Sequence, residues 1–568
     1  MDGISVIDKF SGKFLPETLM SLPDTDFLKI AYSLFEETET IQIKLLREIL
    51  SFAKDTEFGR EHHFADINSV EEFRHQVSIS SWAEYEPYSD RLVAGEADLL
   101  FPGKAVFFTL TSGTSGKEKF IPDSSQSATV RNLIQRYRTL YYFKAVPELL
   151  NGKLLPLTNV PVMSSTASGI PYGTASGLTI GQAGLDDKLA YPIQILRNSD
   201  PLGRDYLLMR LAIEQSEVYV IAGNNAGRLT GLIQLAEEYK DLILQDIEQG
   251  TITGSIPVDP ALRKWLDGKL IPNPERAAQL RDAILKGKAF VPELYWPNLK
   301  LALFWLSSSV GHYVDEVRSL LPDTVRFMDV GYGSSEAKFN IPMQPEDKSG
   351  ALSIATAFYE FLPEEGGEPL LAHQLEVGKH YELIVTTWGG LYRYNMKDIV
   401  LVTGFVGNTP KIEFIRKSSE LLNVAGEKLP ASDVNDCVRM YLKQKGYAVR
   451  QIQIYCDLEE RRYVCYVETS DKALEVTEQM EHDINASLAE KFQFYGMRIY
   501  QQRIMKPMIL VSMKSGWQDF LYSQKLKPGV SLSQIKLPIL IQEPVDAHWF
   551  DVNNRRHETT IRNTCGRR

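Results

Sequence analysis

Residues 107–122 have the sequence FFTLTSGTSGKEKFIP, in which an apolar run typical of a β-strand leads into a loop of small polar residues. Backbone N–H groups and hydroxyls in such a loop can face a concavity and donate to a polyphosphate. A Walker A loop is excluded, because only two residues separate Gly113 from Gly116 and Glu118 follows Lys117. The stretch predicts a phosphate-binding loop of another kind, with a tight strand-to-helix turn as the alternative.

Length, charge and cysteine spacing exclude several classes of protein. A chain of 568 residues is too long for one ordinary core, so we expect two or more domains. The net charge of −11 argues against a nucleic-acid partner, which needs a basic surface. We find no signal peptide and no apolar run of membrane-spanning length, and the four cysteines lack disulfide-framework or zinc spacing. We therefore expect a cytoplasmic protein with no membrane partner.

Helical periodicity and alternating elements indicate the fold class of the first part of the chain. Residues 1 to about 50 are predicted to be helical. A helix at 205–216, a strand at 217–222 and a helix at 228–249 are followed by a second alternation between 300 and 339. Such alternation is typical of an α/β domain with a largely parallel sheet, whose ligands bind beyond the carboxyl ends of the strands.

The later part of the chain is expected to change character twice. From about residue 351 the pattern is mostly strands, and residues 418–428 suit a hinge because they are polar and contain glycine. A separate α+β domain should follow. We expect two domains, residues 1–422 and residues 423–568. The predicted helix, two strands and helix of the second domain are 432–446, 448–457, 462–469 and 477–491.

A second candidate cluster is Tyr332-Gly333-Ser334-Ser335-Glu336. Its ring could stack on a nucleobase, its hydroxyls could donate to phosphate, and its carboxylate could hold Mg²⁺, which prefers oxygen ligands and shares them with phosphates. A turn followed by a helix cap is the alternative.

Two further clusters lie near the expected domain junction. Asp398 precedes an apolar strand and could accept hydrogen bonds from both hydroxyls of a ribose, although a turn aspartate would look the same. Arg416 and Gly426-Glu427-Lys428 could let a hinge carry a lysine into a cleft, and surface salt bridges are the alternative.

In this order, the motifs TSGTSGKEKFIP, VGYGSSE, GLYRYNMKD and LNVAGEKL resemble those of the acyl-acid amido synthetases, first known as the auxin-responsive Gretchen Hagen group of plant proteins. The resemblance spans the chain from about Phe58 to Pro538. It implies the α/β fold of the adenylate-forming superfamily. That fold has a large N-terminal domain of mixed sheets flanked by helices, with a β-rich subdomain, and a small mobile α+β C-terminal domain.

The resemblance also implies an activity. Family members form an acyl adenylate from a carboxylic acid and MgATP, then transfer the acyl group to an amine, commonly of an amino acid. ATP and Mg²⁺ are thus the implied cofactors, and a small carboxylic acid and an amine are the implied partners. The alternatives are an acid–CoA ligase that uses the same acyl adenylate and a catalytically degenerate binding protein.

The matching motifs imply site residues. Glu336 would bind Mg²⁺, and one of Lys119, Lys428 and Lys536 would approach the α-phosphate as the catalytic lysine. Position alone suggests Arg228 and Trp305 for the substrate, and Arg228 could equally be a surface charge at a helix start. The residues implied to bind ATP are Ser112, Gly113, Thr114, Ser115, Tyr332, Gly333, Ser334, Ser335, Asp398 and Arg416.

The chain departs from the family pattern in two informative places. It has Asn395-Met396-Lys397-Asp398 where the family often has Arg-x-Gly-Asp, and we expect the missing glycine to leave ATP binding intact. Near the C-terminus, Ile539 follows Pro538 where the family has arginine, which leaves the role of Lys536 open.

Overall fold

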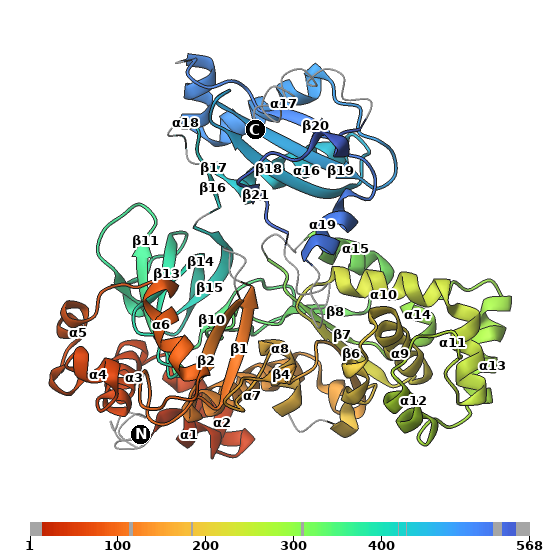
Figure 1. The fold of residues 1–568 in the computed structure, drawn as a ribbon, viewed down its shortest axis with the longest axis horizontal. Helices are drawn as coiled ribbons and strands as arrows, with labels where there is room; N and C mark the ends of the chain where they lie inside the picture. Colours follow the sequence, from red (N-terminus) through yellow and green to blue (C-terminus); the bar gives the residue numbers. More distant parts are fainter. Residues whose placement is uncertain are drawn as a thin grey trace. The chain divides into compact units, whose positions relative to one another are not determined.

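The computed structural model describes residues 14–112, 118–182, 186–307, 312–418, 420–425, 427, 429–501, 503–525 and 537–551. The chain divides into two compact units, Met1–Ile415 and Arg416–Arg568 (Figure 1). This division falls a few residues before the junction expected at 422/423. It places Arg416 in the second unit.

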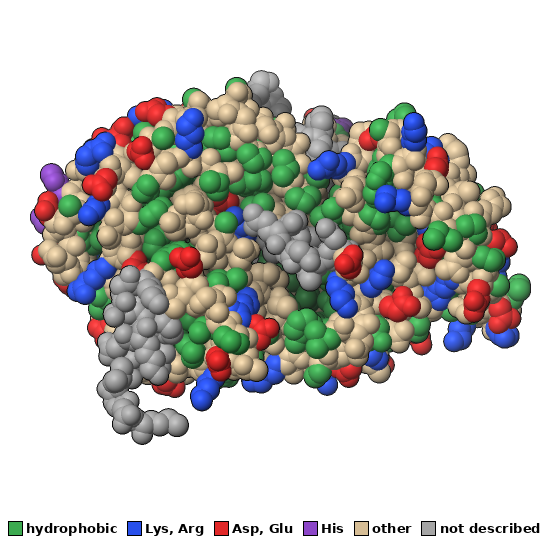
Figure 2. Space-filling view, turned by 90° about the horizontal axis from the view of Figure 1, so that it is seen from below, with side chains coloured by type: hydrophobic (Ala, Val, Ile, Leu, Met, Phe, Trp, Pro, Cys, Tyr) green, Lys and Arg blue, Asp and Glu red, His purple; other side chains and the backbone are tan. Residues whose placement is uncertain are grey.

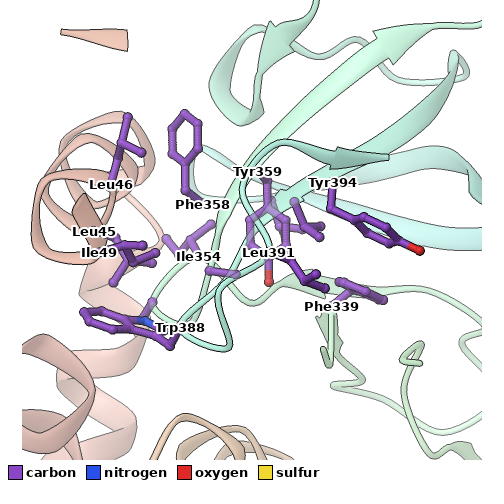
Figure 3. Packing of buried hydrophobic residues seen from close by; sticks show 14 of the residues in the cluster. Leu45, Leu46, Ile49, Phe339, Ile354, Phe358, Tyr359, Trp388, Leu391 and Tyr394 are labelled. Atoms are coloured by element: carbon purple, nitrogen blue, oxygen red, sulfur yellow. The ribbon is translucent and has the colours of Figure 1, made fainter. Parts of the chain in front are cut away.

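Helices dominate residues 14–53, as the periodicity predicts for the chain up to about residue 50, whose first 13 residues lie outside the described ranges; the helices between 57 and 93 were not predicted. Helix α3 packs against the segment that leads into the seven-stranded sheet described below. Gln42 of this helix donates to the carbonyls of Ile354 and Ala357 at 2.7 and 2.9 Å. Figure 3 shows Leu45 and Ile49 of α3 on the side of Ile354 and Trp388. The helices are α1 (Leu15–Met20), α2 (Asp24–Leu34), α3 (Thr38–Ala53), α4 (Glu57–Glu61), α5 (Val70–Gln76) and α6 (Trp82–Val93).

The predicted phosphate loop joins two antiparallel strands. Strand β1 (Phe107–Ser112) pairs with β2 (Glu118–Asp123) along its whole length. The alternative strand-to-helix turn is therefore wrong, and α7 (Ser125–Ala145) begins only after β2. Strands β5 (Pro171–Gly173) and β4 (Ser164–Ser165) complete this sheet, and α8 (Ala175–Gln182) follows them.

A four-stranded parallel sheet confirms the α/β prediction. Its order is β3 (Lys153–Leu157), β6 (Val218–Gly223), β7 (Leu301–Phe304) and β8 (Arg326–Asp329). Helix α9 begins at Pro201, earlier than predicted, because Asp200 caps it by accepting from the N–H of Gly203. The predicted helix at 228–249 is two helices, since the backbone leaves helical geometry at Tyr239.

Helices lie beside this parallel sheet (Figure 1). They are α9 (Pro201–Glu214), α10 (Gly227–Glu238), α11 (Lys240–Gln249), α12 (Pro260–Asp267), α13 (Pro274–Leu285), α14 (Pro292–Tyr295) and α15 (His312–Leu320).

The strand-rich segment forms a seven-stranded sheet in the order β12-β11-β13-β14-β15-β10-β9. The strand predicted to begin at Asp398 begins at Tyr394, so Asp398 lies inside β14. The strands are β9 (Asn340–Ile341), β10 (Gly350–Leu352), β11 (Phe358–Pro363), β12 (Leu370–Leu371), β13 (His380–Thr386), β14 (Tyr394–Val406) and β15 (Thr409–Lys417).

The second unit is the predicted α+β arrangement, with a four-stranded sheet in the order β20-β19-β18-β21. Buried Val434 and Val438 of α16 and Ile484 of α17 share one core with Ile452 and Ile454 of β18. Its elements are β16 (Leu421–Leu422), β17 (Leu429–Pro430), α16 (Ala431–Gln444), β18 (Val449–Asp457), β19 (Arg462–Thr469), α17 (Glu478–Lys491), α18 (Gln493–Gly496), β20 (Ile509–Ser512), α19 (Trp517–Lys525) and β21 (Leu540–Ile541).

The surface of the described residues carries charges of both signs (Figure 2). Acidic and basic side chains are interspersed on the face that Figure 2 displays. Within the described ranges, no helix has both the length and the apolar character that crossing a membrane requires.

Candidate active site

The segment Tyr332–Glu336 follows β8 and folds back on itself as a tight turn, called the acidic turn below. The N–H of Ser334 donates to the carbonyl of Ala337 at 2.9 Å, and the N–H of Phe339 donates to that of Tyr332 at 3.0 Å. Gly331, which precedes the turn, has φ of 91°, and a Cβ there would lie 2.2 Å from the Arg138 guanidinium. Only glycine fits that position.

Two buried charged residues hold the acidic turn in place. Arg138 of α7 donates to the carbonyls of Asn340 and Tyr332 at 2.6 and 3.2 Å. Asp329 accepts from the N–H groups of Gly331 and Leu306 at 2.6 and 2.8 Å, which joins the ends of β8 and β7. Burial raises the pKa of Asp329 to about 6.

Tyr332 and Asp398 meet in the interior. The Tyr332 hydroxyl donates to Asp398 Oδ2 at 2.5 Å, and the two residues are only 8% and 2% exposed. The Tyr332 ring stacks on Phe414 with centroids 5.1 Å apart. Burial and the Asp398 carboxylate raise the pKa of Tyr332 well above its usual value, so the hydroxyl stays a donor.

The acidic turn also touches the strand that leads into the predicted phosphate loop. Ser335 Oγ donates to the carbonyl of Leu110 in β1 at 3.4 Å. Ser112 ends β1, whereas Gly113, Thr114 and Ser115 lie outside the described residues. Three of the predicted clusters therefore converge at this turn.

Lys119 lies on β2, where its ammonium sits 5.6 Å from the centre of the Trp82 ring of α6. Such a position allows a cation–π attraction, which favours keeping the charge on that side of the strand. The structure thus gives Lys119 a partner that the sequence pattern did not suggest.

Glu336 fits a hard cation. Its backbone N–H donates to Ser334 Oγ at 3.2 Å, while its partly buried carboxylate receives no hydrogen bond from the described residues. No group of three or more His, Cys, Asp or Glu in the described ranges could form a metal centre by itself. One carboxylate suits Mg²⁺ when phosphate oxygens supply the other ligands.

Sequence reasoning missed Lys338, which is partly buried next to the acidic turn. Its ammonium donates to the carbonyl of Ser334 at 3.4 Å. Burial, together with the nearby charges of Arg138 and Arg131, lowers the pKa of Lys338 to about 7. A lysine among polar residues carries no local sequence signal for burial.

The two candidate substrate residues differ. Arg228, at the start of α10, pairs with Asp205 through both carboxylate oxygens, one contact measuring 2.7 Å. Trp305, just after β7, donates from Nε1 to the carbonyl of Gly331 at 3.2 Å and so lies beside the acidic turn.

The remaining candidates belong to the second unit. Arg416 is 5% exposed, and its Nη1 donates to the carbonyl of Lys417 at 3.4 Å. Glu427 accepts from the N–H groups of Val424 and Ala425 at 2.7 and 2.6 Å, which shapes the hinge segment. Lys428 and Lys536 lie outside the described residues.

Two protein-family models match this chain. The model described as "GH3 family N-terminal domain" matches residues 28–325, and that of the "GH3 family central domain" matches residues 350–417. The chain belongs to the GH3 family. The resemblance inferred from the motifs is thereby confirmed.

Curated GH3 relatives are similar over nearly their whole length. The "4-substituted benzoates-glutamate ligase GH3.12" of Arabidopsis thaliana is 26% identical over 554 residues, covering 91% of this chain and 95% of the relative. The "Indole-3-acetic acid-amido synthetase GH3.3" of the same plant is 25% identical, covering 91% and 92%.

Solved structures confirm the GH3 fold. The "GH3.15 acyl acid amido synthetase" superposes with a TM-score of 0.80 at 22% identity, covering 91% of this chain and 94% of the other. A "2-Hydroxyisobutyryl-CoA Ligase" in complex with "R3-HIB-AMP" reaches a TM-score of 0.51 at 12% identity, covering 92% of this chain and 91% of the other. The predicted adenylate-forming architecture is therefore correct.

Proposed function

We propose that this GH3 protein is an ATP-dependent ligase that adenylates a carboxylic acid and transfers the acyl group to an amine, most simply that of an amino acid. The names of its curated relatives describe amide-forming ligases of this kind. The amido synthetase class inferred from the motifs is therefore confirmed at the level of the family.

One observation carries the proposal for the site. The acidic turn contacts the Asp398 strand through the Tyr332 hydroxyl and the phosphate-loop strand through Ser335. A nucleotide that reached from Asp398 past this turn to the loop would meet a ribose acceptor, a carboxylate for a cation and loop donors in that order.

We assign the parts of ATP accordingly. Asp398 accepts from the ribose hydroxyls, and Tyr332 borders the adenine. Gly333 and Ser334 shape the turn, Ser335 faces the phosphates, and Ser112, Gly113, Thr114 and Ser115 hold them. We propose Arg416 at the ribose and phosphate.

Glu336 is the proposed Mg²⁺ ligand, because its carboxylate has no protein donor among the described residues. When bound, Mg²⁺ would neutralise charge on the phosphates.

The first half-reaction needs positioning more than covalent chemistry. The substrate carboxylate attacks the α-phosphorus in line, the bond to pyrophosphate breaks, and pyrophosphate leaves with the electron pair. A lysine near the α-phosphate would stabilise the added negative charge, and losing such an interaction lowers the rate about 100-fold or more. Lys119, Lys428 and Lys536 remain the candidates.

In the second half-reaction an uncharged amine attacks the acyl carbon and AMP leaves. We propose that movement of the second unit exchanges the adenylating groups for an amine-accepting surface, since domain closure commonly gates such steps. Trp305 is the proposed wall of the acid pocket because it borders the acidic turn. The Asp205 ion pair favours a structural role for Arg228.

Pyrophosphate release on a panel of carboxylic acids tests the proposal, followed by mass analysis with amino acids or CoA added. We expect release with at least one acid and an amide product with an amino acid. A thioester instead would indicate the acid–CoA ligase alternative. If no acid causes pyrophosphate release and ATP does not raise the melting temperature, the protein is not an enzyme of this kind.

We also propose a cytoplasmic location, where ATP and Mg²⁺ are supplied. Cell fractionation with antibodies against the chain tests it, and recovery in the membrane or secreted fraction would contradict it.

A further inference from the structure

The backbone around Asp398 is irregular. Strand β14 pairs with β13 at Asn395 and again at Ile399, but the register shifts between them. Met396, Lys397 and Asp398 consequently stand opposite the single residue Leu383. Because a bulge frees residues from the hydrogen-bond ladder, local contacts decide where Asp398 points.

Lys397, in the middle of this bulge, has an unfavourable backbone conformation. Its φ is 55°, in the left-handed region that disfavours residues with a Cβ. This is the position where the family pattern often has glycine, which adopts such a φ freely. Something else must hold the backbone here.

Asn395 supplies that support through both ends of its amide. Its Oδ1 accepts from the Lys397 N–H at 2.8 Å, forming an Asx turn, and its Nδ2 donates to Glu382 Oε1 at 2.6 Å. Asn395 is only 7% exposed, and the Glu382 side chain is 12% exposed. The Lys397 ammonium, whose side chain is 55% exposed, adds a contact to Glu382 at 3.2 Å.

We propose that Asn395, anchored by Glu382, is a positioning residue that keeps Lys397 left-handed and so sets the Asp398 carboxylate for a ribose diol. The proposal rests on the proposed function, in which Asp398 binds the ribose of ATP. The pair does the work that glycine does elsewhere in the family. Tyr332 holds Asp398 Oδ2 at the same time, so two side chains from different elements orient one carboxylate.

Ribose discrimination by the full chain tests the proposal directly. ATP and 2′,3′-dideoxy-ATP are titrated calorimetrically in the absence of acid. The wild type should prefer ATP by about tenfold or more, because the dideoxy analogue lacks the two hydroxyls that would donate to the buried Asp398 carboxylate. Asp398→Ala should remove the preference, and Asn395→Ala should remove most of it.

Rescue distinguishes positioning from general support. Lys397→Gly should keep the preference for ATP. The double variant Asn395→Ala/Lys397→Gly should regain most of it, because glycine adopts a left-handed φ without the support of Asn395. Asn198→Ala is the matched control, since Asn198 is also buried but contacts Pro257 and Asp259 instead. That variant should lower the melting temperature and leave the preference unchanged.

The outcomes separate the two proposals. If the wild type shows no preference, or if Asp398→Ala keeps it, the ribose assignment is wrong, and so is the proposal that Asn395 positions Asp398. If Asp398→Ala loses the preference while Asn395→Ala keeps it, or if the double variant regains nothing, only the positioning role of Asn395 is overturned. Should Asn395→Ala not fold, Glu382→Ala removes the carboxylate that anchors Asn395 and contacts Lys397, and it should reduce the preference.

Discussion

Arg393 and Lys397 lie in the same motif and both have positive φ, 47° and 55°, yet different surroundings hold them. The Arg393 side chain is 6% exposed and forms two hydrogen bonds with Glu360, which is 1% exposed. Lys397 is largely exposed and depends on Asn395. The buried pair supports the fold around the start of β14, whereas the exposed position tunes the neighbouring Asp398.

The largest effect is expected for Arg393→Ala. It leaves the buried Glu360 carboxylate with one fewer cation and removes bonds to the carbonyls of Val77 and Arg74, so stability should fall by about 3–5 kcal/mol. Urea unfolding measures this. Arg281→Ala, which breaks an exposed pair with Glu248, should lower stability by less than about 1 kcal/mol. Equal losses would contradict the contrast between buried and exposed support.

Lys338→Met should reveal how the stability of the wild type depends on the protonation of Lys338. The folded pKa of Lys338, about 7, is below its unfolded value of 10.5, so the unfolded chain binds more protons between these pH values. Wild-type stability should therefore rise relative to Lys338→Met as pH increases from 7 toward 10, by on the order of 2 kcal/mol after allowing for partial exposure. Melting temperatures of both proteins at pH 6, 7.5 and 9 measure this. A constant difference would mean that Lys338 titrates normally.

Tyr332→Phe should weaken ATP binding about tenfold and lower stability by about 1–3 kcal/mol, less than Arg393→Ala. The change keeps the ring against Phe414 and removes only the donor to Asp398. ATP titration and thermal unfolding together check it. An affinity unchanged within twofold would show that the bulge alone orients Asp398, and a large fall in melting temperature would show a role in the fold like that of Arg393.

The smallest effect is expected for Lys397→Gly. Relief of the left-handed strain is opposed by the greater backbone freedom of glycine when unfolded, so stability should change by less than about 1 kcal/mol. Chemical denaturation checks this against Arg393→Gly, which should lose several kcal/mol because the buried pair is lost too. A comparable loss in both would make the two left-handed residues equivalent.

Much of the fold could be predicted because it rests on local patterns. The parallel sheet with its helices and the α+β unit follow from alternation and periodicity, which depend on neighbouring residues. Errors arose where a single backbone angle or cap decided the outcome, as at Tyr239, where one predicted helix became two, and at Asp200, where a cap extended another. The predicted start of β14, Asp398, is later than the observed start, Tyr394, because the pairing with β13 resumes after a bulge, which no local pattern marks.

The candidate site divides in the same way. Tyr332, Ser335, Glu336 and Asp398 could be selected from their residue types and order, since each chemical role requires a particular side chain. Arg138, Asp329 and Lys338 could not, because their importance comes from burial against segments far away in the chain. Such a residue looks like an ordinary charged residue of a helix or turn.

The sequence by itself thus determined the family, the class of chemistry and the order of the motifs, because these depend on which side chains are present and how they are spaced. Only the tertiary structure decided that Tyr332 donates to Asp398, that Ser335 reaches β1, and that Asn395 accepts from the Lys397 N–H. Those contacts join residues through sheet register and buried packing, and neither can be obtained from spacing along the chain.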